Sequence, residues 1–376
     1  MKWLNQIMAI IIVFTIIFSD HSNSQAEENI AVSAESAIVM DQNSNRILFH
    51  KNANQKMRIA SITKIMTAIL AIESGKLDQY VTVSSRAVHT EGSSIYLQEK
   101  QKVKLKDLVY GLMLRSGNDA AVAIAEFVGG SVEGFVFMMN QKAELIGMSN
   151  TKFSNPHGLD DHENHYSTAY DMALLTKYAM ENKTFKKIFG TKEYHSGGFH
   201  WKNKNKLLNL YEYCTGGKTG YTKRAKRTLV STAAKDGLHL ISVTLNAPDD
   251  WNDHISMYDH AFGKYENVMV KKEGYLDNIH NSIYQNHIFL NRDVVLPLTK
   301  EEMASVTLRL SVIKPKEDWR NHPQEAPAKV GMLNVLIKDK IIEKVPIYFD
   351  NGQIEKPNRF LKNFQSIFWK VTGAPA

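Results

Sequence analysis

Residues 65–72 (IMTAILAI) constrain the fold more than any other segment, because they are apolar almost all round. A helix without a polar face belongs in the middle of a domain rather than on its surface. The chain has 376 residues, of which 43% are hydrophobic and 23% charged, and these values are ordinary for a globular protein. The length predicts two or three domains, and the composition excludes a disordered or fibrous chain.

Helix and strand patterns are mixed from about residue 30 to residue 265, which predicts a domain of both kinds around the buried helix. Two apolar segments on either side of a polar turn, residues 37–40 and 46–49, indicate a β-hairpin. A turn at residues 116–119 separates two further helices, and we expect Asn118 or Asp119 to cap the second. The other predicted elements are helices at residues 105–114, 120–128 and 171–180 and strands at residues 228–233 and 238–245.

The pattern changes after residue 268, where strand-like alternation replaces the mixture. Residues 306–312 alternate apolar and polar side chains, as in a half-buried strand, and residues 333–337 do the same. Residues 314–328 are rich in proline and charge, which predicts a long loop. We therefore predict a small β-rich domain over residues 269–355, after a first domain over residues 27–268.

The N-terminus has the features of an export signal. Lys2 precedes an apolar run at residues 7–18, and small side chains at Ser24 and Ala26 suit a cleavage site. The run is too short to span a hydrocarbon core of about 30 Å. We expect residues 1–26 to be a cleaved signal peptide and the mature protein to work outside the cytoplasm.

The C-terminal residues 356–376 combine an apolar face with basic flanks. Phe360, Phe364 and Phe368 recur at helical spacing, with Lys362 and Lys370 among the basic residues around them. Such a helix can lie in the headgroup plane of an anionic membrane, and the formal net charge of +7 suits that partner. The alternative is a terminal helix docked on the protein itself. We find no nucleic-acid-binding motif, so we expect no nucleic acid as a partner.

The first chemical motif is Ser61-Ile-Thr-Lys64, at the start of the predicted buried helix. Residues at i and i+3 lie on one helix face, so the Lys64 amine can reach the Ser61 hydroxyl. Burial lowers the pKa of a lysine, and a neutral lysine can take the proton of a serine nucleophile. The spacing alone is weak evidence, since a capping serine with a nearby lysine has it too, and Ser149-Asn-Thr-Lys152 repeats it without a buried helix after it.

Two further motifs follow in order. Ser116-Gly-Asn118 is compatible with a helix cap in a turn, or with a hydroxyl in a proton path and an amide on a substrate carbonyl. Lys218-Thr219-Gly220, preceded by two glycines, is compatible with an ordinary turn before a strand. In a functional site, Lys218 would be a second cation, and Gly220 would let a substrate approach the strand edge.

Together the three motifs resemble those of the serine penicillin-recognising enzymes. Longer stretches, ASITKIMTA at residues 60–68 and LMLRSGNDAA at residues 112–121, are similar to the D-alanyl-D-alanine carboxypeptidases among the low-molecular-mass penicillin-binding proteins. The resemblance implies an α/β (α+β) domain of the serine DD-peptidase and β-lactamase type, with an antiparallel sheet and a helical cluster. A small all-β domain and a C-terminal amphipathic helix would follow it.

The resemblance also implies a reaction without a cofactor or metal. Ser61 would attack the carbonyl between the two terminal D-alanines of a peptidoglycan stem peptide, and Lys64 would accept its proton. Ser116, with Lys218, would relay the proton to the leaving D-alanine, while Asn118 would hold the substrate amide. β-Lactams would acylate Ser61.

Substrate binding would involve the strand that carries the third motif. The resemblance implies that Thr219 holds the terminal carboxylate, that Gly220 gives access to the strand, and that the N–H groups of Ser61 and Tyr221 form the oxyanion hole. The protein would act at the outer face of the bacterial cytoplasmic membrane, in cell-wall maturation. Residues 246–254 are similar to members used in building spore cortex, which also suggests a sporulation role.

This sequence departs from the family pattern at two places. Lys226 occupies a position where members often carry glycine, so we expect it to be strained if the backbone there has φ > 0. Residues 246–254 lack the arginine that in many members pairs with the substrate carboxylate. We expect Arg224 or Arg227 to take its place beside Thr219.

Three rival functions stay open at this point. Histidines clustered at residues 157–165 could belong to a zinc peptidase, although they lack a recognised metal-ligand spacing. A β-lactamase would share the first and third motifs but would need a glutamate positioned for deacylation. A cell-wall binding protein without activity is the third possibility, and the intact motifs argue against it.

Overall fold

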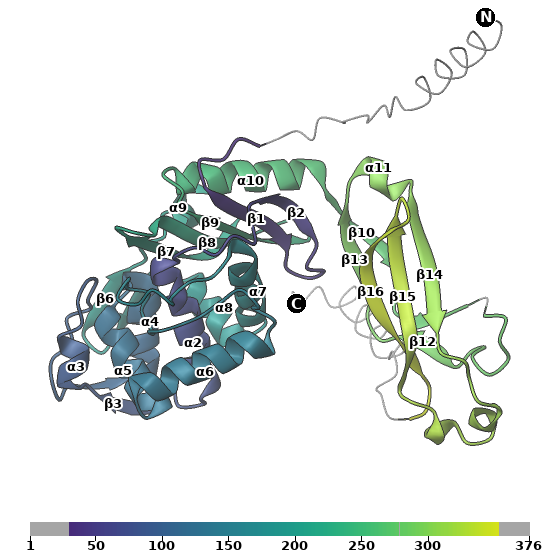
Figure 1. Cartoon of the computed structure of the whole chain (residues 1–376), viewed down its shortest axis with the longest axis horizontal. Coiled ribbons are helices and arrows are strands. Elements are labelled where there is room, and N and C mark those ends of the chain that lie inside the picture. Colours follow the sequence, from purple (N-terminus) through teal and green to yellow (C-terminus); the bar gives the residue numbers. More distant parts are fainter. Residues whose placement is uncertain (1–29, 278, 353–376) are drawn as a thin grey trace, which may run out of the picture. The chain divides into compact units, whose positions relative to one another are not determined.

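The structure is a computed structural model that describes residues 30–277 and 279–352. Its first domain is built on a five-stranded sheet in which every neighbouring pair is antiparallel, in the order β2-β1-β9-β8-β7 (Figure 1). Strands that alternate with short turns along the chain favour this arrangement. The strands are β1 (Ser36–Asp41), β2 (Ile47–Lys51), β7 (Cys214–Thr222), β8 (Lys226–Lys235) and β9 (Leu238–Leu245).

Different helices pack against the two faces of this sheet. Val230 and Val243 are opposite each other on β8 and β9 and belong to the main hydrophobic core. Their neighbours Ser231 and Ser242 face the other way, and the Ser231 hydroxyl bonds to the ring of His254 on helix α10 (Asp250–Lys264). Since side chains alternate across a strand, α10 covers one face and the helical cluster covers the other.

The helical cluster surrounds α2 (Lys64–Glu73), whose first nine residues are all buried. The segment at residues 65–72 therefore lies where its composition predicts. Around it pack α4 (Leu105–Arg115), α5 (Asn118–Gly129), α6 (Val132–Leu145), α7 (Ala169–Met180) and α8 (Lys183–Phe189). Smaller elements are η1 (Ala60–Thr63), α3 (Ser85–Val88), α9 (Leu207–Leu210), the strand pair β3 (Tyr80–Thr82) and β4 (Lys102–Lys104), and the hairpin β5 (Glu193–Ser196) and β6 (Phe199–Lys202).

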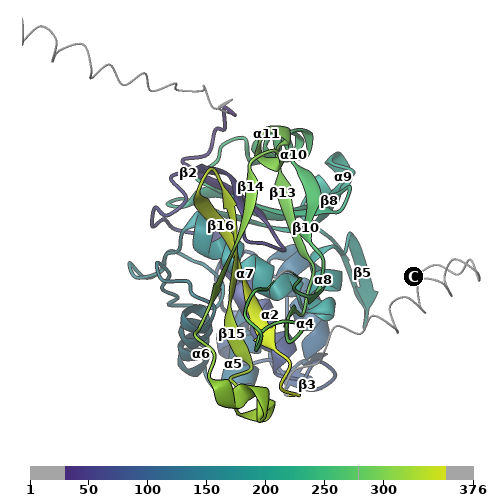
Figure 2. The same ribbon diagram turned by 90° about the vertical axis from the view of Figure 1, so that its right-hand side faces the viewer.

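The second domain is all-β, as predicted, with its own core around Leu333, Val345 and Trp319. Figure 2 shows its long strands β14, β15 and β16 side by side. They belong to a five-stranded sheet in the order β11-β12-β16-β15-β14, and β10 pairs with β13 in a second ladder. The elements are β10 (Glu266–Lys271), β11 (Gly274–Tyr275), β12 (Ile288–Leu290), β13 (Val294–Leu298), α11 (Lys300–Met303), β14 (Val306–Val312), η2 (Glu317–Arg320), η3 (Pro323–Glu325), β15 (Lys329–Ile337) and β16 (Lys340–Phe349).

Two details differ from the sequence prediction. Strand β14 exists, but Leu308 and Leu310 are 41% and 42% exposed rather than half-buried, because this edge strand has little cover and its residues are exposed on both faces. The cap of α5 is Gly117, without a side-chain hydrogen bond. Asn118 does not cap the helix, because its amide bonds to Lys64 and to the Glu91 carbonyl instead.

The predicted signal peptide at residues 1–26 and amphipathic helix at residues 356–376 lie outside the described residues. Within residues 30–277 and 279–352, no single helix is long and apolar enough to cross a membrane. Helices α5 and α6 pass that test only as a pair bent by 83°.

Candidate active site

The amine of Lys64 lies at the centre of the first two motifs. Lys64 is the first residue of α2 and is 0% exposed, and its Nζ lies 2.9 Å from the Oγ of Ser61. The same Nζ donates to Asn118 Oδ1 at 2.7 Å and to the His157 carbonyl at 2.6 Å. Asn118 Nδ2 in turn donates to the Glu91 carbonyl at 2.6 Å, so the amide oxygen of Asn118 is the atom that faces Lys64.

These partners suit a neutral amine. A neutral amine has two N–H donors and one lone pair, and Lys64 has two carbonyl acceptors and one hydroxyl around it. Burial, followed by the positive charges of Lys218 and Lys204, lowers the pKa of Lys64 well below its ordinary value. In the neutral form, with both N–H groups bonded to the two carbonyls, the lone pair is left for the Ser61 hydroxyl, as a base requires.

A second buried amine belongs to Lys218 on β7. Its Nζ donates to Ser116 Oγ at 3.1 Å and to the Thr219 carbonyl at 2.7 Å. Burial, and then the charge of Lys204, lowers the pKa of Lys218 to about 7. The positive charge of Lys218 is one cause of the lowered pKa of Lys64, so a proton on Lys218 favours a neutral Lys64.

The backbone around the two serines is tightly constrained. Ala60, directly before Ser61, has φ 48°, and Ser116, at the end of α4, has φ 66°. Left-handed conformations are rare for residues other than glycine and persist where the surroundings hold them in place, often at functional sites. Gly220 is needed here because a Cβ on it would lie 2.8 Å from the Ser61 nitrogen. Glycine at this position thus lets strand β7 lie directly against the backbone of Ser61.

A cavity of about 320 Å³ opens over this arrangement. Lys64, Asn118 and Lys218 are buried and absent from its lining, while Tyr221 is 64% exposed at its edge. The structure therefore brings all eight predicted site residues together, with three of them behind the cavity wall. The lining consists of Ser61, Ser93, Ser116, Lys204, Thr219, Gly220, Tyr221, Arg227, Asp250 and Trp251.

Comparison with known proteins identifies this arrangement. Residues 22–249 match the sequence profile of a family described as D-alanyl-D-alanine carboxypeptidase. The chain belongs to that family. Residues 280–353 match a second profile, described as penicillin-binding protein 5, C-terminal domain. The predicted fold class is thus confirmed for both domains.

Individual relatives agree with the profiles. The D-alanyl-D-alanine carboxypeptidase DacF of Bacillus subtilis (strain 168) is 38% identical over 63% of this chain, and the match spans 64% of its own length, just under two thirds. DacC of Escherichia coli (strain K12) is 32% identical over 86% of this chain and 85% of its own. The crystal structure of penicillin-binding protein 5 from Haemophilus influenzae superposes with a TM-score of 0.73 at 27% identity, covering 86% of this chain and 98% of that one.

The two departures from the family pattern have structural consequences. Lys226 has φ 58°, the strained conformation that was expected if this position needs φ > 0. Arg224 forms an ion pair with Glu163 and is not in the cavity lining. Arg227 does line the cavity, where it pairs with Asp250, and its Nε is buried without a hydrogen-bond partner among the described residues.

The rival functions find no support in the geometry. The ring of His165 bonds to Thr63 Oγ1 at 2.9 Å and to the Ser154 N–H at 3.1 Å, while the His157 ring accepts from the Leu159 N–H. Burial lowers the pKa of both histidines to about 3, and among the described residues neither belongs to a group of three metal-ligand side chains. Within the described part of the chain, no glutamate lines the cavity over Ser61, where a β-lactamase would need one.

The sequence motifs do not indicate several of the groups at the site. Lys204 lines the cavity and donates to Ser93 Oγ at 3.3 Å, and the carbonyls of His157 and Glu91 fix the amine and the amide. Lys204 lies in a run of alternating lysine and asparagine that does not single it out. Backbone carbonyls have no sequence signature, so only the fold could identify them.

Proposed function

We propose that this chain is a serine-type D-alanyl-D-alanine carboxypeptidase that removes the terminal D-alanine from peptidoglycan stem peptides. The observation that carries the proposal is the buried Lys64 amine, 2.9 Å from Ser61 Oγ, with both of its donors bound to carbonyl acceptors. That arrangement makes an otherwise weak serine nucleophile reactive. Membership of the carboxypeptidase family supports the choice of substrate.

The reaction then has two stages. In the first, the lone pair of Lys64 takes the Ser61 proton as Oγ bonds to the carbonyl carbon, and the N–H groups of Ser61 and Tyr221 stabilise the oxyanion. Collapse of the intermediate breaks the peptide bond, and the Ser116 hydroxyl, bonded to Lys218, passes a proton to the departing D-alanine nitrogen. Lys218 replaces the proton that Ser116 has lost. In the second stage, water attacks the acyl-enzyme, its proton returns through Ser116 to Lys218, and Lys64 gives its proton back to Ser61.

Asn118 acts in this account as a positioning residue. Its amide oxygen bonds to Lys64 and its amide nitrogen to the Glu91 carbonyl. It also does not line the cavity. We therefore favour the orientation of Lys64 as its main role, ahead of direct contact with the substrate amide.

Recognition of the terminal carboxylate falls to Thr219 and Arg227. Both line the cavity, and the guanidinium of Arg227 is a charged donor group that can pair with a carboxylate. The centre of the Trp251 ring lies 5.5 Å from the guanidinium carbon of Arg227, and the ring packs against one side of the guanidinium. Lys204 adds a second positive charge to the same cavity.

The test is D-alanine release from a pentapeptide ending in D-Ala-D-Ala, with a peptide ending in D-Ala-L-Ala as the control substrate. We expect release from the first peptide, no release after Ser61→Ala, and no loss of activity with a metal chelator. Inhibition by the chelator would favour the zinc peptidase. Rapid turnover of penicillin, instead of a long-lived acyl-enzyme, would favour the β-lactamase.

The remaining predictions concern location. We propose a cleaved signal at residues 1–26, a catalytic domain at 27–268, a β-rich domain at 269–355 and a helix at 356–376 that holds the enzyme at the outer face of the membrane. The basic and apolar faces of the last segment support this placement. Co-sedimentation with anionic vesicles, lost on deletion of residues 356–376, tests it. The sporulation role stays a prediction.

A further inference from the structure

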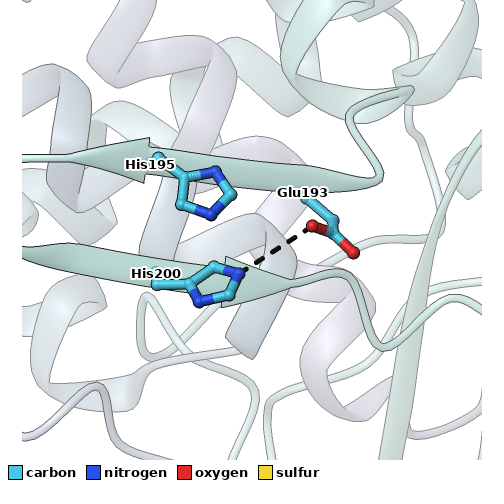
Figure 3. A group of neighbouring side chains, drawn as sticks. All are labelled: Glu193, His195 and His200. Atoms are coloured by element: carbon cyan, nitrogen blue, oxygen red, sulfur yellow. Dashed lines mark ion pairs between the residues drawn. The ribbon is translucent and has the colours of Figure 1, made fainter.

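The β5–β6 hairpin presents three metal-ligand side chains on a single face (Figure 3). His195 and His200 are directly opposite each other in the antiparallel register, and Glu193 precedes His195 by two residues on the same strand. Side chains at i and i+2, and those directly opposite, project from the same face of a sheet. The hairpin backbone therefore directs all three side chains to the same side.

The opposite face of the hairpin fixes which side is exposed. Trp201 is buried in the main core, and the Tyr194 ring stacks on Tyr110, 3.6 Å away between ring centroids. The Tyr194 hydroxyl also donates to Asp107. A register slip would place these aromatic residues in water, so the Glu193, His195 and His200 side chains are held on the solvent face.

The three side chains are also close in space. Their ligand atoms all lie within 4.8 Å of one another, and this is the one such group of three or more ligand side chains in the described part of the chain. The two imidazole rings stack with centroids 4.0 Å apart, and His200 Nε2 lies 3.8 Å from Glu193 Oε2. All three residues are exposed, so an ion can reach them from solvent.

We propose that Glu193, His195 and His200 bind one divalent transition-metal ion of the Zn²⁺ class. Two imidazole nitrogens and one carboxylate oxygen are ligands that Zn²⁺ accepts, and the fourth position would hold water. Ligand distances near 2.1 Å would bring the three donor atoms to about 3.4 Å apart, so separations that now reach at most 4.8 Å would shorten by about 1.4 Å or less. Harder ions such as Mg²⁺ prefer an all-oxygen set and would be excluded.

The ion pair between Glu193 and Lys202 competes only weakly with metal binding. Lys202 Nζ lies 3.4 Å from Glu193 Oε1, and the two side chains are 72% and 48% exposed. Exposed ion pairs of this kind contribute little free energy, so an ion can displace the lysine. None of the three ligands lines the catalytic cavity, so this site is separate from the acylation chemistry.

The test is calorimetric titration of the full folded chain, without an affinity tag, with ZnCl₂ and with MgCl₂. We expect saturable binding of one Zn²⁺ and no binding of Mg²⁺. Replacing one ligand of three in His195→Ala, His200→Ala or Glu193→Gln should weaken Zn²⁺ binding about tenfold or more. His50→Ala, which removes an exposed strand histidine outside the cluster, is the matched control and should leave binding unchanged.

Two further measurements keep the result unambiguous. Co²⁺ bound to nitrogen and oxygen ligands absorbs visible light, so Co²⁺ should give a visible spectrum with the wild type and with His50→Ala but not with His195→Ala. All variants should still be acylated by penicillin, which shows that they fold. Zn²⁺ binding that is absent in the wild type, or unchanged in both histidine variants, would overturn the proposal and leave the carboxypeptidase account untouched.

Discussion

Two of the three Ser-X-X-Lys segments in the chain, at residues 61–64 and 149–152, have environments that differ completely. Ser61 and Lys64 lie where a 3₁₀ turn leads into a buried helix, and their side chains are hydrogen bonded. Ser149 and Lys152 are both exposed, and Lys152 forms an isolated β-bridge with Tyr166. Identical spacing thus places one lysine in a dry pocket and the other in water.

The difference shows what makes a lysine a base. Helical backbone brings the Ser61 and Lys64 side chains onto one face, while residues 149–152 form a turn that leads into the β-bridge of Lys152. Burial then lowers the pKa of Lys64, whereas the exposed Lys152 has no comparable cover. The spacing is necessary for the motif, but the helix and the burial provide the chemistry.

The largest expected effect comes from the same substitution at the two lysines. Lys64→Arg replaces the base with a guanidinium that stays protonated, so acylation by penicillin should fall about 10³-fold. Lys152→Arg should leave the rate unchanged. The acylation rates are measured by stopped-flow spectroscopy, or by rapid quenching of the reaction followed by mass spectrometry of the protein.

Arginine is larger than lysine, so folding must be checked separately. Lys64→Met, which fits the same volume without an amine, should lose acylation equally while both variants keep the circular dichroism spectrum of the wild type. Acylation at more than a tenth of the wild-type rate in either folded variant would contradict a base role for Lys64.

A second, smaller effect is expected at the other buried amine. Lys218→Gln removes the cation bonded to Ser116 and should slow acylation about 10²-fold, as loss of a preorganised electrostatic group does. The surface variant Lys223→Gln, five residues further along, is the control. An unchanged rate in Lys218→Gln would show that Ser116 works without its lysine.

The third effect concerns substrate binding at Arg227. Arg227→Gln should raise KM for the D-Ala-D-Ala peptide about tenfold and change kcat less, because a charged partner of the carboxylate is lost. Arg224→Gln, which breaks the ion pair with Glu163 outside the cavity, should not change KM. Equal changes of KM in the two variants would show that Arg227 does not bind the substrate carboxylate.

The smallest effect is on the pH dependence of stability. Lys64 has a lowered pKa in the folded state and an ordinary pKa of about 10.4 in the unfolded state. The unfolded state therefore binds more protons below pH 10.4, and the stability of the wild type should rise as the pH increases from its lowered pKa toward that value.

Substitution of Lys64 separates its contribution to the pH dependence of stability from the contributions of other titratable groups. Lys64→Met should reduce the slope of the free energy of unfolding against pH, measured by urea titration in the range just below the ordinary lysine pKa of about 10.4. Lys152→Met should leave the slope as it is in the wild type. An equal slope in all three proteins would mean that Lys64 is charged in the folded state.

Local patterns were enough to predict much of the fold and to select residues that the structure brings together. The buried helix at residues 65–72, the hairpin of β1 and β2 and the turn between β8 and β9 depend on periodicity within a few residues, and all are present. Ser61, Lys64 and Lys218 belong to motifs with a recognisable order. They are close together in the structure although up to 157 positions separate them.

The rest depends on tertiary contacts that no local pattern encodes. Which of Arg224 and Arg227 lines the cavity could not be predicted, because both are basic residues near β7. Arg227 pairs with Asp250 in the cavity lining, and Arg224 pairs with Glu163 outside it. The exposure of β14 was mispredicted because alternation does not reveal whether a strand has cover. The role of Asn118 in holding Lys64 follows from side chains 54 positions apart.

The most direct test of the central claim is the intact mass of the protein after incubation with penicillin. The account predicts one adduct on the wild type and on Ser149→Ala, and none on Ser61→Ala. An adduct that persists in Ser61→Ala, or its loss in Ser149→Ala alone, would contradict the assignment of Ser61 as the nucleophile activated by a neutral Lys64.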